Sequence, residues 1–434
     1  MSTNNLQIRS LTPLYLVNFI GTLGFSIVLP FLVVLVLKFG GNEFIYGILG
    51  ATYSFFQFVG APVLGSWSDK IGRRKVLIIS QVGTFSAWIV FLIALLIPQN
   101  VVTNINSQLI GAFVVSVPLV LLFFARALDG LTGGNVSVAN AYLVDITPED
   151  DRSKYFGKMS VAGNLGFMIG PALAGILGST ILGNILPIIL AMLISLIAIM
   201  VITFGLENAP ECKKLSVPAS LDRTRKILGQ EHKECHPMEG QEQYSLADIL
   251  RLKNVPFLLT QYFLIFLAFN FFYVAFPVHA ITTLDWTVFD LGLFFSALSL
   301  VMIVFQGPVL GKASQYFTDG TLVTFGGVLL ATGFFLFTYS QLSVIALGTV
   351  IFAAGNGIMW PSFLSLISKV ASQKYQGALQ GFASSAGSLA SIVGLLTGSV
   401  LYSQINTYIF IIPAVIIVLI VMTFIKKRGI RIAT

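Results

Sequence analysis

The stretch Gly65-Ser-Trp-Ser-Asp69-Lys-Ile-Gly72-Arg73-Arg74-Lys75 decides the fold of this 434-residue chain. It places one acid and four cations in a few residues, and long apolar runs lie on both sides. Cations held between apolar runs are typical of a short turn at the anionic inner surface of a membrane. The stretch therefore predicts a hairpin of two membrane-spanning helices joined at that surface.

The composition indicates an integral membrane protein. Hydrophobic residues make up 56 % of the sequence and charged residues 10 %, and the mean hydropathy is +0.89. Soluble proteins carry about 25 % charged residues. The 40 glycines and 37 phenylalanines suit closely packed helices, whereas barrel strands would alternate polar and apolar residues. We expect an all-α membrane protein, in which the net charge of +7 reflects topology rather than nucleic-acid binding.

Polar breaks divide the sequence into twelve apolar segments, and a bilayer-spanning helix needs roughly 20 such residues. The segments lie at about 11–37, 45–66, 76–98, 112–143, 157–181, 184–206, 255–280, 288–311, 321–340, 343–367, 378–402 and 407–425. Lysines and arginines gather on one side of this plan, with Lys38 and Arg126 as the exceptions. We therefore expect both termini in the cytoplasm, a plasma (inner) membrane location and no removable signal peptide.

One long hydrophilic stretch, 207–253, separates six segments from the other six. We predict an N-terminal six-helix bundle at 1–206, a cytoplasmic linker at 207–253 and a C-terminal six-helix bundle at 254–434. The only cysteines, Cys212 and Cys235, lie in the linker, so no disulfide framework is implied.

Two short motifs recur at equivalent places in the two halves. Pro62-Val-Leu-Gly65 is repeated as Pro308-Val-Leu-Gly311, 246 residues later, and Lys154-Tyr155-Phe-Gly157 as Lys374-Tyr375-Gln-Gly377, 220 residues later. Parallel repeats of this kind are typical of transporters built from two related halves.

The opening stretch resembles the signature G-x-x-x-D-x-x-G-R-R/K of the major facilitator superfamily, and the twelve segments and central linker extend the resemblance over the whole chain. The resemblance implies two pseudo-symmetric six-helix bundles that open alternately to the two sides of the membrane. It also implies an inner gate in which Asp69 contacts the start of span 11 and Arg73 pairs with Asp145. Gly65, Gly72 and Arg74 complete this gate, and the glycines are expected to let the helix ends approach.

The second-half copy of the turn departs from the signature. Gln315 stands in place of the acid, and Thr318-Asp319 replace Gly72-Arg73. We therefore expect the gate to be one-sided.

The fifth segment carries small residues at every fourth position, which makes one smooth helical face. The run Gly166-x-x-x-Gly170-Pro171-x-x-Ala174-Gly175 resembles the motif of proton-coupled antiporters in the superfamily, with alanine in place of one usual glycine. In the fourth segment, the run Ala125 to Thr147 resembles the tetracycline-antiporter branch. The resemblance implies export, and we expect this face to form a close contact between the two halves. The alternative is ordinary packing between neighbouring helices.

Arg126 and Asp129 lie within the fourth segment, where a charge costs free energy unless it has a partner or a wet cavity. Their spacing of three residues places both side chains on one helical face. The structural interpretation is a self-neutralising pair. The functional interpretation is that Asp129 exchanges a proton, while Arg126 tunes its affinity or holds an anionic group of the substrate.

Polar and aromatic residues within the other segments outline a central substrate pocket. An apolar cavity with few polar anchors suits a lipophilic or amphipathic molecule. Each of these residues alone could instead bond a neighbouring helix. The candidates are Asn18, Tyr53, Gln57, Asn164, Gln261, Asn270, Tyr273, Asn356 and Trp360.

The sequence contains no phosphate-binding loop and no clustered Cys/His metal set, so we expect neither an enzyme nor a cofactor. The predicted function is secondary active transport, as proton-coupled antiport of small lipophilic or amphipathic organic molecules, by a monomer in contact with lipid. The alternatives are a metabolite uptake symporter or uniporter of the same fold, and a receptor or scaffold that transports nothing.

Overall fold

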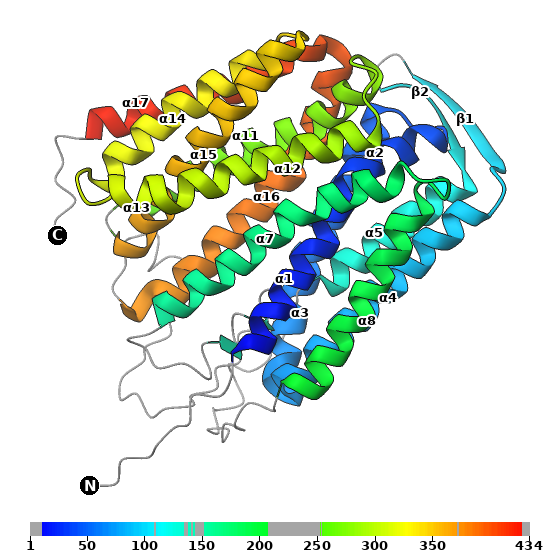
Figure 1. Cartoon of the computed structure of the whole chain (residues 1–434), viewed down its shortest axis with the longest axis horizontal. Helices are drawn as coiled ribbons and strands as arrows, with labels where there is room; N and C mark the ends of the chain where they lie inside the picture. The colour runs from blue at the N-terminus through cyan, green and yellow to red at the C-terminus, as the bar shows by residue number, and fades with distance from the viewer. Residues whose placement is uncertain are drawn as a thin grey trace, which may run out of the picture.

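The structure, a computed structural model, describes residues 11–107, 110–133, 138–139, 142–143, 152–206, 252, 254–370 and 373–427. Two groups of helices lie side by side (Figure 1). The first contains α1 (Thr12–Ile27), α2 (Leu29–Lys38), α3 (Glu43–Ile71), α4 (Arg73–Leu96), α5 (Val117–Thr132), α7 (Arg152–Gly178) and α8 (Ile185–Gly205). The second contains α11 (Val255–Thr282), α12 (Val288–Val304), α13 (Leu310–Ala313), α14 (Asp319–Leu336), α15 (Leu342–Val370), α16 (Gln373–Ile405) and α17 (Ile411–Lys427).

Within the described ranges, ten helical stretches are long and apolar enough to cross a membrane. One of them, Phe382–Lys426, takes in both α16 and α17, and α1 and α2 together form another. The break between α1 and α2 falls at Val28, just before Pro30, which has no N–H to continue the first helix. The arrangement is the predicted all-α fold of two bundles, and it is consistent with twelve spans.

The segment predicted to form a helix over 112–143 begins differently in the structure. Residues 112–116 belong to β2 (Gly111–Ser116), which pairs antiparallel with β1 (Val101–Ser107), and α5 starts only at Val117. Ser116 caps the helix by accepting a hydrogen bond from the Leu119 N–H at 3.4 Å. The prediction was wrong here because an apolar strand next to an apolar helix makes one continuous hydrophobic run.

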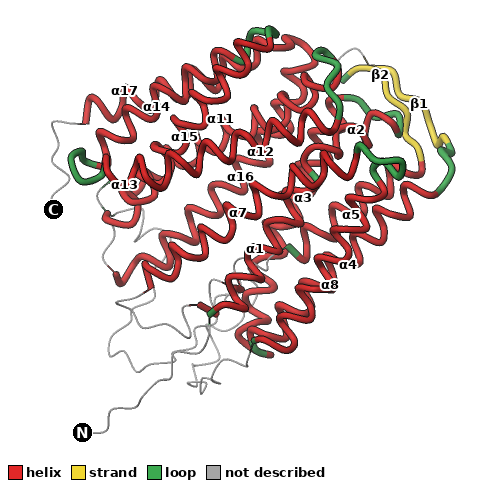
Figure 2. Tube along the Cα trace, viewed as in Figure 1, coloured by secondary structure: helices red, strands yellow, loops and turns green. Residues whose placement is uncertain are grey.

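The β1–β2 pair defines one end of the molecule, called here the hairpin end. Figure 2 shows the strands there, while α1 begins and α17 ends at the opposite end. The strands are fixed on the α2–α3 turn, where the Val114 N–H donates to the Gly40 carbonyl at 2.8 Å and the Ser116 hydroxyl donates to the Phe39 carbonyl at 2.7 Å. The pair therefore packs against the end of α2.

The two bundles touch mainly along two helix pairs, α7 with α12 and α3 with α16. Glycines allow both contacts. A Cβ at Gly292 of α12 would overlap the Pro171 carbonyl of α7, and a Cβ at Gly47 of α3 would overlap the Ser399 side chain of α16. Gly47 and Gly292 lie near the ends of their helices that face the hairpin end, so the bundles are in close contact there.

The core of the second bundle is aromatic. Phe272 and Phe276 of α11 stack on each other, and the rings of Phe272 and Phe352 are 4.9 Å apart. All three side chains are fully buried. This cluster fixes α11 against α15, because buried ring pairs contribute beyond their burial alone.

Candidate functional site

Arg126 and Asp129 form an ion pair inside α5, as their spacing predicts. The Arg126 Nη1 lies 3.6 Å from the Asp129 Oδ2, and the side chains are only 6 % and 12 % exposed. Arg126 is nine residues into a helix that starts at the hairpin end, or about 14 Å along its axis. The pair is therefore a buried charge centre within the span. The separation of the two atoms is too long for a hydrogen bond.

Residues from two neighbouring helices surround this pair. The Arg126 guanidinium lies over the Tyr53 ring of α3, 4.4 Å from its centroid, an arrangement in which the ring face attracts the cation. Gln57 donates to the Tyr53 hydroxyl at 3.1 Å and to the Gly133 carbonyl at 3.2 Å. Thr84 of α4 lies close to the Asp129 carboxylate. Tyr53 and Gln57, two predicted pocket residues, therefore belong to the Arg126–Asp129 centre.

Small residues bring these helices close enough to build the centre. A Cβ at Gly130 of α5 would overlap the Tyr53 carbonyl, and a Cβ at Gly60 of α3 would overlap the Leu131 carbonyl. On the other side of α5, the Ser80 hydroxyl of α4 donates to the Thr132 carbonyl. The glycine next to Asp129 thus has a packing role that places Tyr53 over Arg126.

The Arg126 guanidinium is incompletely paired. Its Nε and Nη1 are buried and have no hydrogen-bond partner among the residues that the structure describes. An arginine offers five N–H donors, and a buried donor without an acceptor is costly. Within the described residues, the centre therefore lacks an acceptor oxygen for these two nitrogens of Arg126.

Three of the predicted pocket residues serve to join helices. Asn18 donates to the Met159 carbonyl at 2.7 Å, Asn270 to the Ser391 hydroxyl at 3.0 Å, and Asn356 to the Met302 sulfur at 3.5 Å. These bonds match the alternative in which polar residues act as contacts between neighbouring helices.

The other predicted pocket residues lie in the second bundle or between the bundles. Gln261 is buried and its Oε1 has no partner among the described residues. The Tyr273 carbonyl accepts a 3.5 Å hydrogen bond from Tyr46 of the first bundle. Trp360 packs on the rings of Tyr262 and Phe266, each with centroids 5.4 Å away.

Asn164 reaches across the two bundles to a residue that the sequence did not indicate. Its Nδ2 donates to the Gln306 Oε1 at 3.0 Å. Gln306 lies in a single π-helical turn, η2 (Phe305–Val309), which interrupts the eighth span at Gly307-Pro308. Such turns are frequent at functional sites. The signal in the sequence is Pro308, which cannot donate to the regular helical ladder.

The small residues of α7 divide between two contacts. Cβ atoms at Gly166 and Gly170 would meet α1 of the same bundle, at Phe19, Thr22, Leu23 and Ser26. Cβ atoms at Gly175 and Gly178 would meet Phe289 and Val288 of α12 in the other bundle. Pro171 lies inside α7, its carbonyl against Gly292, and Ala174 is buried. The expectation of one face between the halves is therefore wrong for Gly166 and Gly170, because the helix turns them toward α1.

The turn between α3 and α4 has the predicted position, and its glycines differ in what they do. Gly72 has φ +98°, a backbone conformation that a side chain disfavours. A Cβ at Gly65 would meet no described atom within 4 Å. Gly65 therefore does not provide the expected close approach of the two helix ends.

The cations of this turn bind near it. Arg73 donates to the Ser68 hydroxyl at 2.5 Å, and Arg74 donates to the Thr203 carbonyl of α8. The side chain of Asp69 and the whole of Asp145 lie outside the described residues, so the predicted gate contacts stay a prediction.

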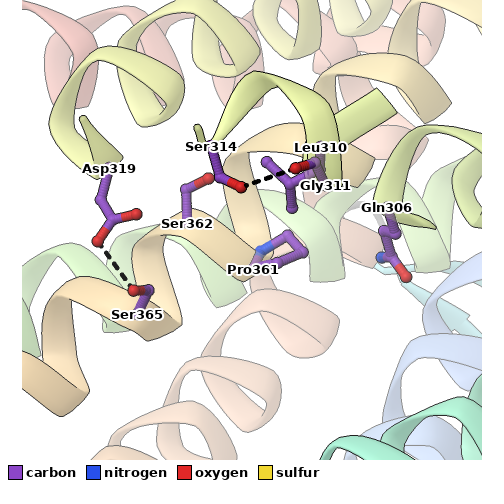
Figure 3. A pocket seen from close by; sticks show the side chains of 8 residues that line it. All are labelled: Gln306, Leu310, Gly311, Ser314, Asp319, Pro361, Ser362 and Ser365. Atoms are coloured by element: carbon purple, nitrogen blue, oxygen red, sulfur yellow. Dashed lines mark hydrogen bonds between the residues drawn. The ribbon is translucent and has the colours of Figure 1, made fainter. Parts of the chain in front are cut away.

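The corresponding turn of the second bundle carries an ion pair of its own. The Lys369 Nζ donates to the Asp319 Oδ2 at 2.6 Å, and the Ser365 hydroxyl donates to the same oxygen at 2.8 Å. Asp319 and Ser365 line a pocket of about 270 Å³ that Gln306 also lines. Figure 3 shows Asp319 pointing toward Ser365 at its edge. The second turn therefore carries a polar contact of its own, and the expectation of a one-sided gate stays a prediction.

No cluster of three or more metal-ligating side chains occurs in the described part of the chain. The centre therefore consists of one carboxylate, one guanidinium, hydroxyls, amides and aromatic rings. Such groups can bind an organic molecule and can hold or release a proton at Asp129.

Comparisons with known proteins place this architecture. The chain is 27 % identical to a class D tetracycline resistance protein from Salmonella ordonez over 83 % of its length and 80 % of that protein. It is 25 % identical to multidrug resistance protein 2 of Bacillus subtilis, over 91 % of the chain and 88 % of that protein. The crystal structure of a D-xylose-proton symporter superposes with a TM-score of 0.72 at 15 % identity, over 95 % of this chain and 96 % of that one. The sequence pattern of the Major Facilitator Superfamily matches residues 14–394, with a second match over 258–430. The chain belongs to the Major Facilitator Superfamily and is a multi-pass membrane transporter.

Proposed function

We propose that the protein exports small lipophilic or amphipathic organic molecules in exchange for protons, with Asp129 as the proton-binding group. The observation that carries the proposal is the buried Arg126–Asp129 pair, because an ionisable residue inside a span is functional by default. The relatives named for tetracycline and multidrug resistance support export. The likeness to a proton symporter extends to the fold alone, so the direction of transport relative to the proton has to be decided by experiment.

Orientation and organisation are part of the proposal. The distribution of lysine and arginine supports cytoplasmic termini in a plasma (inner) membrane. The hairpin end then faces outward, and the bundles are 1–206 and 254–434 with a cytoplasmic linker at 207–253. The transporter works as a monomer in lipid, and the gate of Asp69, Arg73 and Asp145 closes its inner side.

The test uses purified protein in lipid vesicles with an imposed pH gradient and tetracycline as the first probe. Exchange predicts that vesicles with an acidic lumen accumulate the drug, because protons leave as the drug enters. Symport predicts accumulation in vesicles with an alkaline lumen. Asp129→Asn should abolish gradient-driven accumulation, since asparagine carries no exchangeable acid proton.

Asp290→Asn is the matched control. Asp290 caps α12 through Thr287, accepting its N–H at 2.9 Å, and lies at the start of the helix rather than within the bundle. This variant should retain gradient-driven accumulation. Wild-type accumulation by Asp129→Asn would exclude the proposed role of Asp129.

A further inference from the structure

Within the part of the chain that the structure describes, the Arg126–Asp129 pair leaves hydrogen-bond donors of the guanidinium unused. Its 3.6 Å separation exceeds hydrogen-bonding distance, and the Nε and Nη1 of Arg126 have no partner among the described residues. Both residues are more than nine-tenths buried. A molecule that brings an acceptor oxygen to the guanidinium therefore gains a charge-assisted hydrogen bond that the protein leaves unmade.

The charge of that molecule determines how it couples to protons. An anion at Arg126 competes with the Asp129 carboxylate for the same cation, so it binds best when Asp129 is protonated. Anion and proton would then travel together, which is symport. A cation that binds Asp129 meets a carboxylate whose charge Arg126 already compensates. It also lies next to Arg126, so repulsion between the two positive charges opposes its binding.

A zwitterion satisfies both members of the pair at once. Its anionic oxygen accepts from Arg126, and its ammonium donates to the charged Asp129 carboxylate. Protonation of Asp129 removes the partner of the ammonium, so proton and substrate exclude each other. Mutual exclusion at one site is what exchange requires, since each ligand leaves when the other binds.

The walls beside the pair suit an aromatic body. The Tyr53 ring lies 5.3 Å from the Phe25 ring of α1, which in turn lies 5.9 Å from the Phe167 ring of α7. All three side chains are only partly buried. These rings offer stacking surface from three helices of the first bundle.

We propose that the substrates are zwitterions with an aromatic body, whose acidic group binds Arg126 and whose ammonium binds Asp129. The inference rests on the proposed proton exchange, because only that direction of coupling excludes an anionic substrate. It adds a substrate class to the proposed site, and it assigns Arg126 to substrate recognition rather than to proton transfer alone.

The test measures binding to the purified full-length protein, with no gradient present. The probes are phenylalanine, tryptophan and a coumarinyl amino acid, each in four forms: the free zwitterion, the cationic methyl ester, the anionic N-acetyl acid and the neutral N-acetyl methyl ester. Affinity is read from the ligand-induced rise in the thermal unfolding midpoint. At least one zwitterion should bind about tenfold or more tightly than its three derivatives, given the strength of hydrogen bonds to charged groups.

Two variants separate recognition from mere stability. Asp129→Asn, which mimics the protonated acid, should shift the preference to the anionic N-acetyl form. Arg126→Gln should shift it to the cationic ester. Loss of fold would lower the affinity for all four forms equally, whereas a role in recognition changes their order. The Asp290→Asn control should keep the wild-type order.

The outcomes are distinguishable from those of the transport experiment. Preference of the wild type for an anionic, cationic or neutral form, or binding of no zwitterion in the panel, overturns the inference. Zwitterion preference without gradient-driven flux would sustain the assigned substrate class and exclude the proposed exchange. Gradient-driven exchange of tetracycline with no zwitterion preference would sustain exchange alone.

Discussion

At Gly130, the absence of a side chain determines where Tyr53 lies. A Cβ there would overlap the Tyr53 carbonyl and stand 3.0 Å from the Phe56 Cβ. Gly130→Ala should therefore push α5 away from α3 and move the ring off the Arg126 guanidinium. We expect a loss of about 1–3 kcal/mol in the free energy of unfolding, as for other overpacked sites, measured by thermal unfolding of the purified protein.

Gly24→Ala provides the control for Gly130→Ala. Gly24 also lies inside a spanning helix, but a Cβ there would meet no described atom within 4 Å. Alanine has the higher helix propensity, so this variant should be as stable as the wild type or more so. Equal losses in the two variants would contradict the packing role of Gly130.

The ion pair could be predicted from the sequence, and its surroundings could not. Residues three apart on a helix share a face, so Arg126 and Asp129 had to be neighbours. That Tyr53 covers the guanidinium depends on how closely α3 approaches α5. Such an approach follows from packing at Gly60 and Gly130, which hydropathy does not report.

Among the elements, long helices were predictable because each must satisfy its own backbone hydrogen bonds across some 20 residues in lipid. The strands 101–107 and 111–116 were missed, since short elements at the surface obey no such length rule. A cap signal was nevertheless present. Ser116 followed by Pro118 marks a helix start, which places the beginning of α5 after the apolar run.

The turn between the eighth and ninth spans is an element whose charges are reversed relative to the first turn. Its Asp319 occupies the position of Arg73 in the 246-residue repeat, and Ser365 occupies the position of Asp145 in the 220-residue repeat. An acid thus faces a hydroxyl and Lys369, whereas the contact predicted for the first turn joins a cation to an acid. The contact observed in the second turn therefore has the opposite polarity to the contact predicted for the first.

This reversal makes a prediction about variants of the second turn. Lys369 is 64 % exposed and Asp319 16 %, so the pair should contribute at most about 1 kcal/mol to stability. Asp319→Lys should nevertheless reduce transport, because it places two cations together at a helix start, where the helix dipole also opposes them. The double variant Asp319→Lys with Lys369→Asp should regain much of the lost rate in the vesicle assay.

Gln315→Ala is the control for the second turn. Gln315 is exposed and takes the place of the signature acid in the repeat, so its truncation should leave transport near the wild-type rate. A double variant no better than Asp319→Lys alone would show that the ion pair itself is not what matters.

On the scale of the whole molecule, the two bundles are joined at the hairpin end. Gly175 and Gly178 of α7 face Phe289 and Val288 at the start of α12. Alternating access requires each end of the contact between the halves to open in turn. The contact at Gly178 must therefore separate once in every transport cycle.

A reversible cross-link tests this requirement. A Cβ at Gly178 would lie 3.7 Å from the Val288 Cβ, close to the mean of about 3.8 Å in disulfides. The native Cys212 and Cys235 would first be replaced by serine, and Gly178→Cys with Val288→Cys then introduced. Oxidation should join the bundles and stop gradient-driven transport, and a reducing agent should restore it. Each single-cysteine variant should transport equally under both conditions.

Full transport by a completely cross-linked protein would show that the hairpin end stays closed throughout the cycle. The movement that exposes Arg126 and Asp129 to the outside would then have to follow another path.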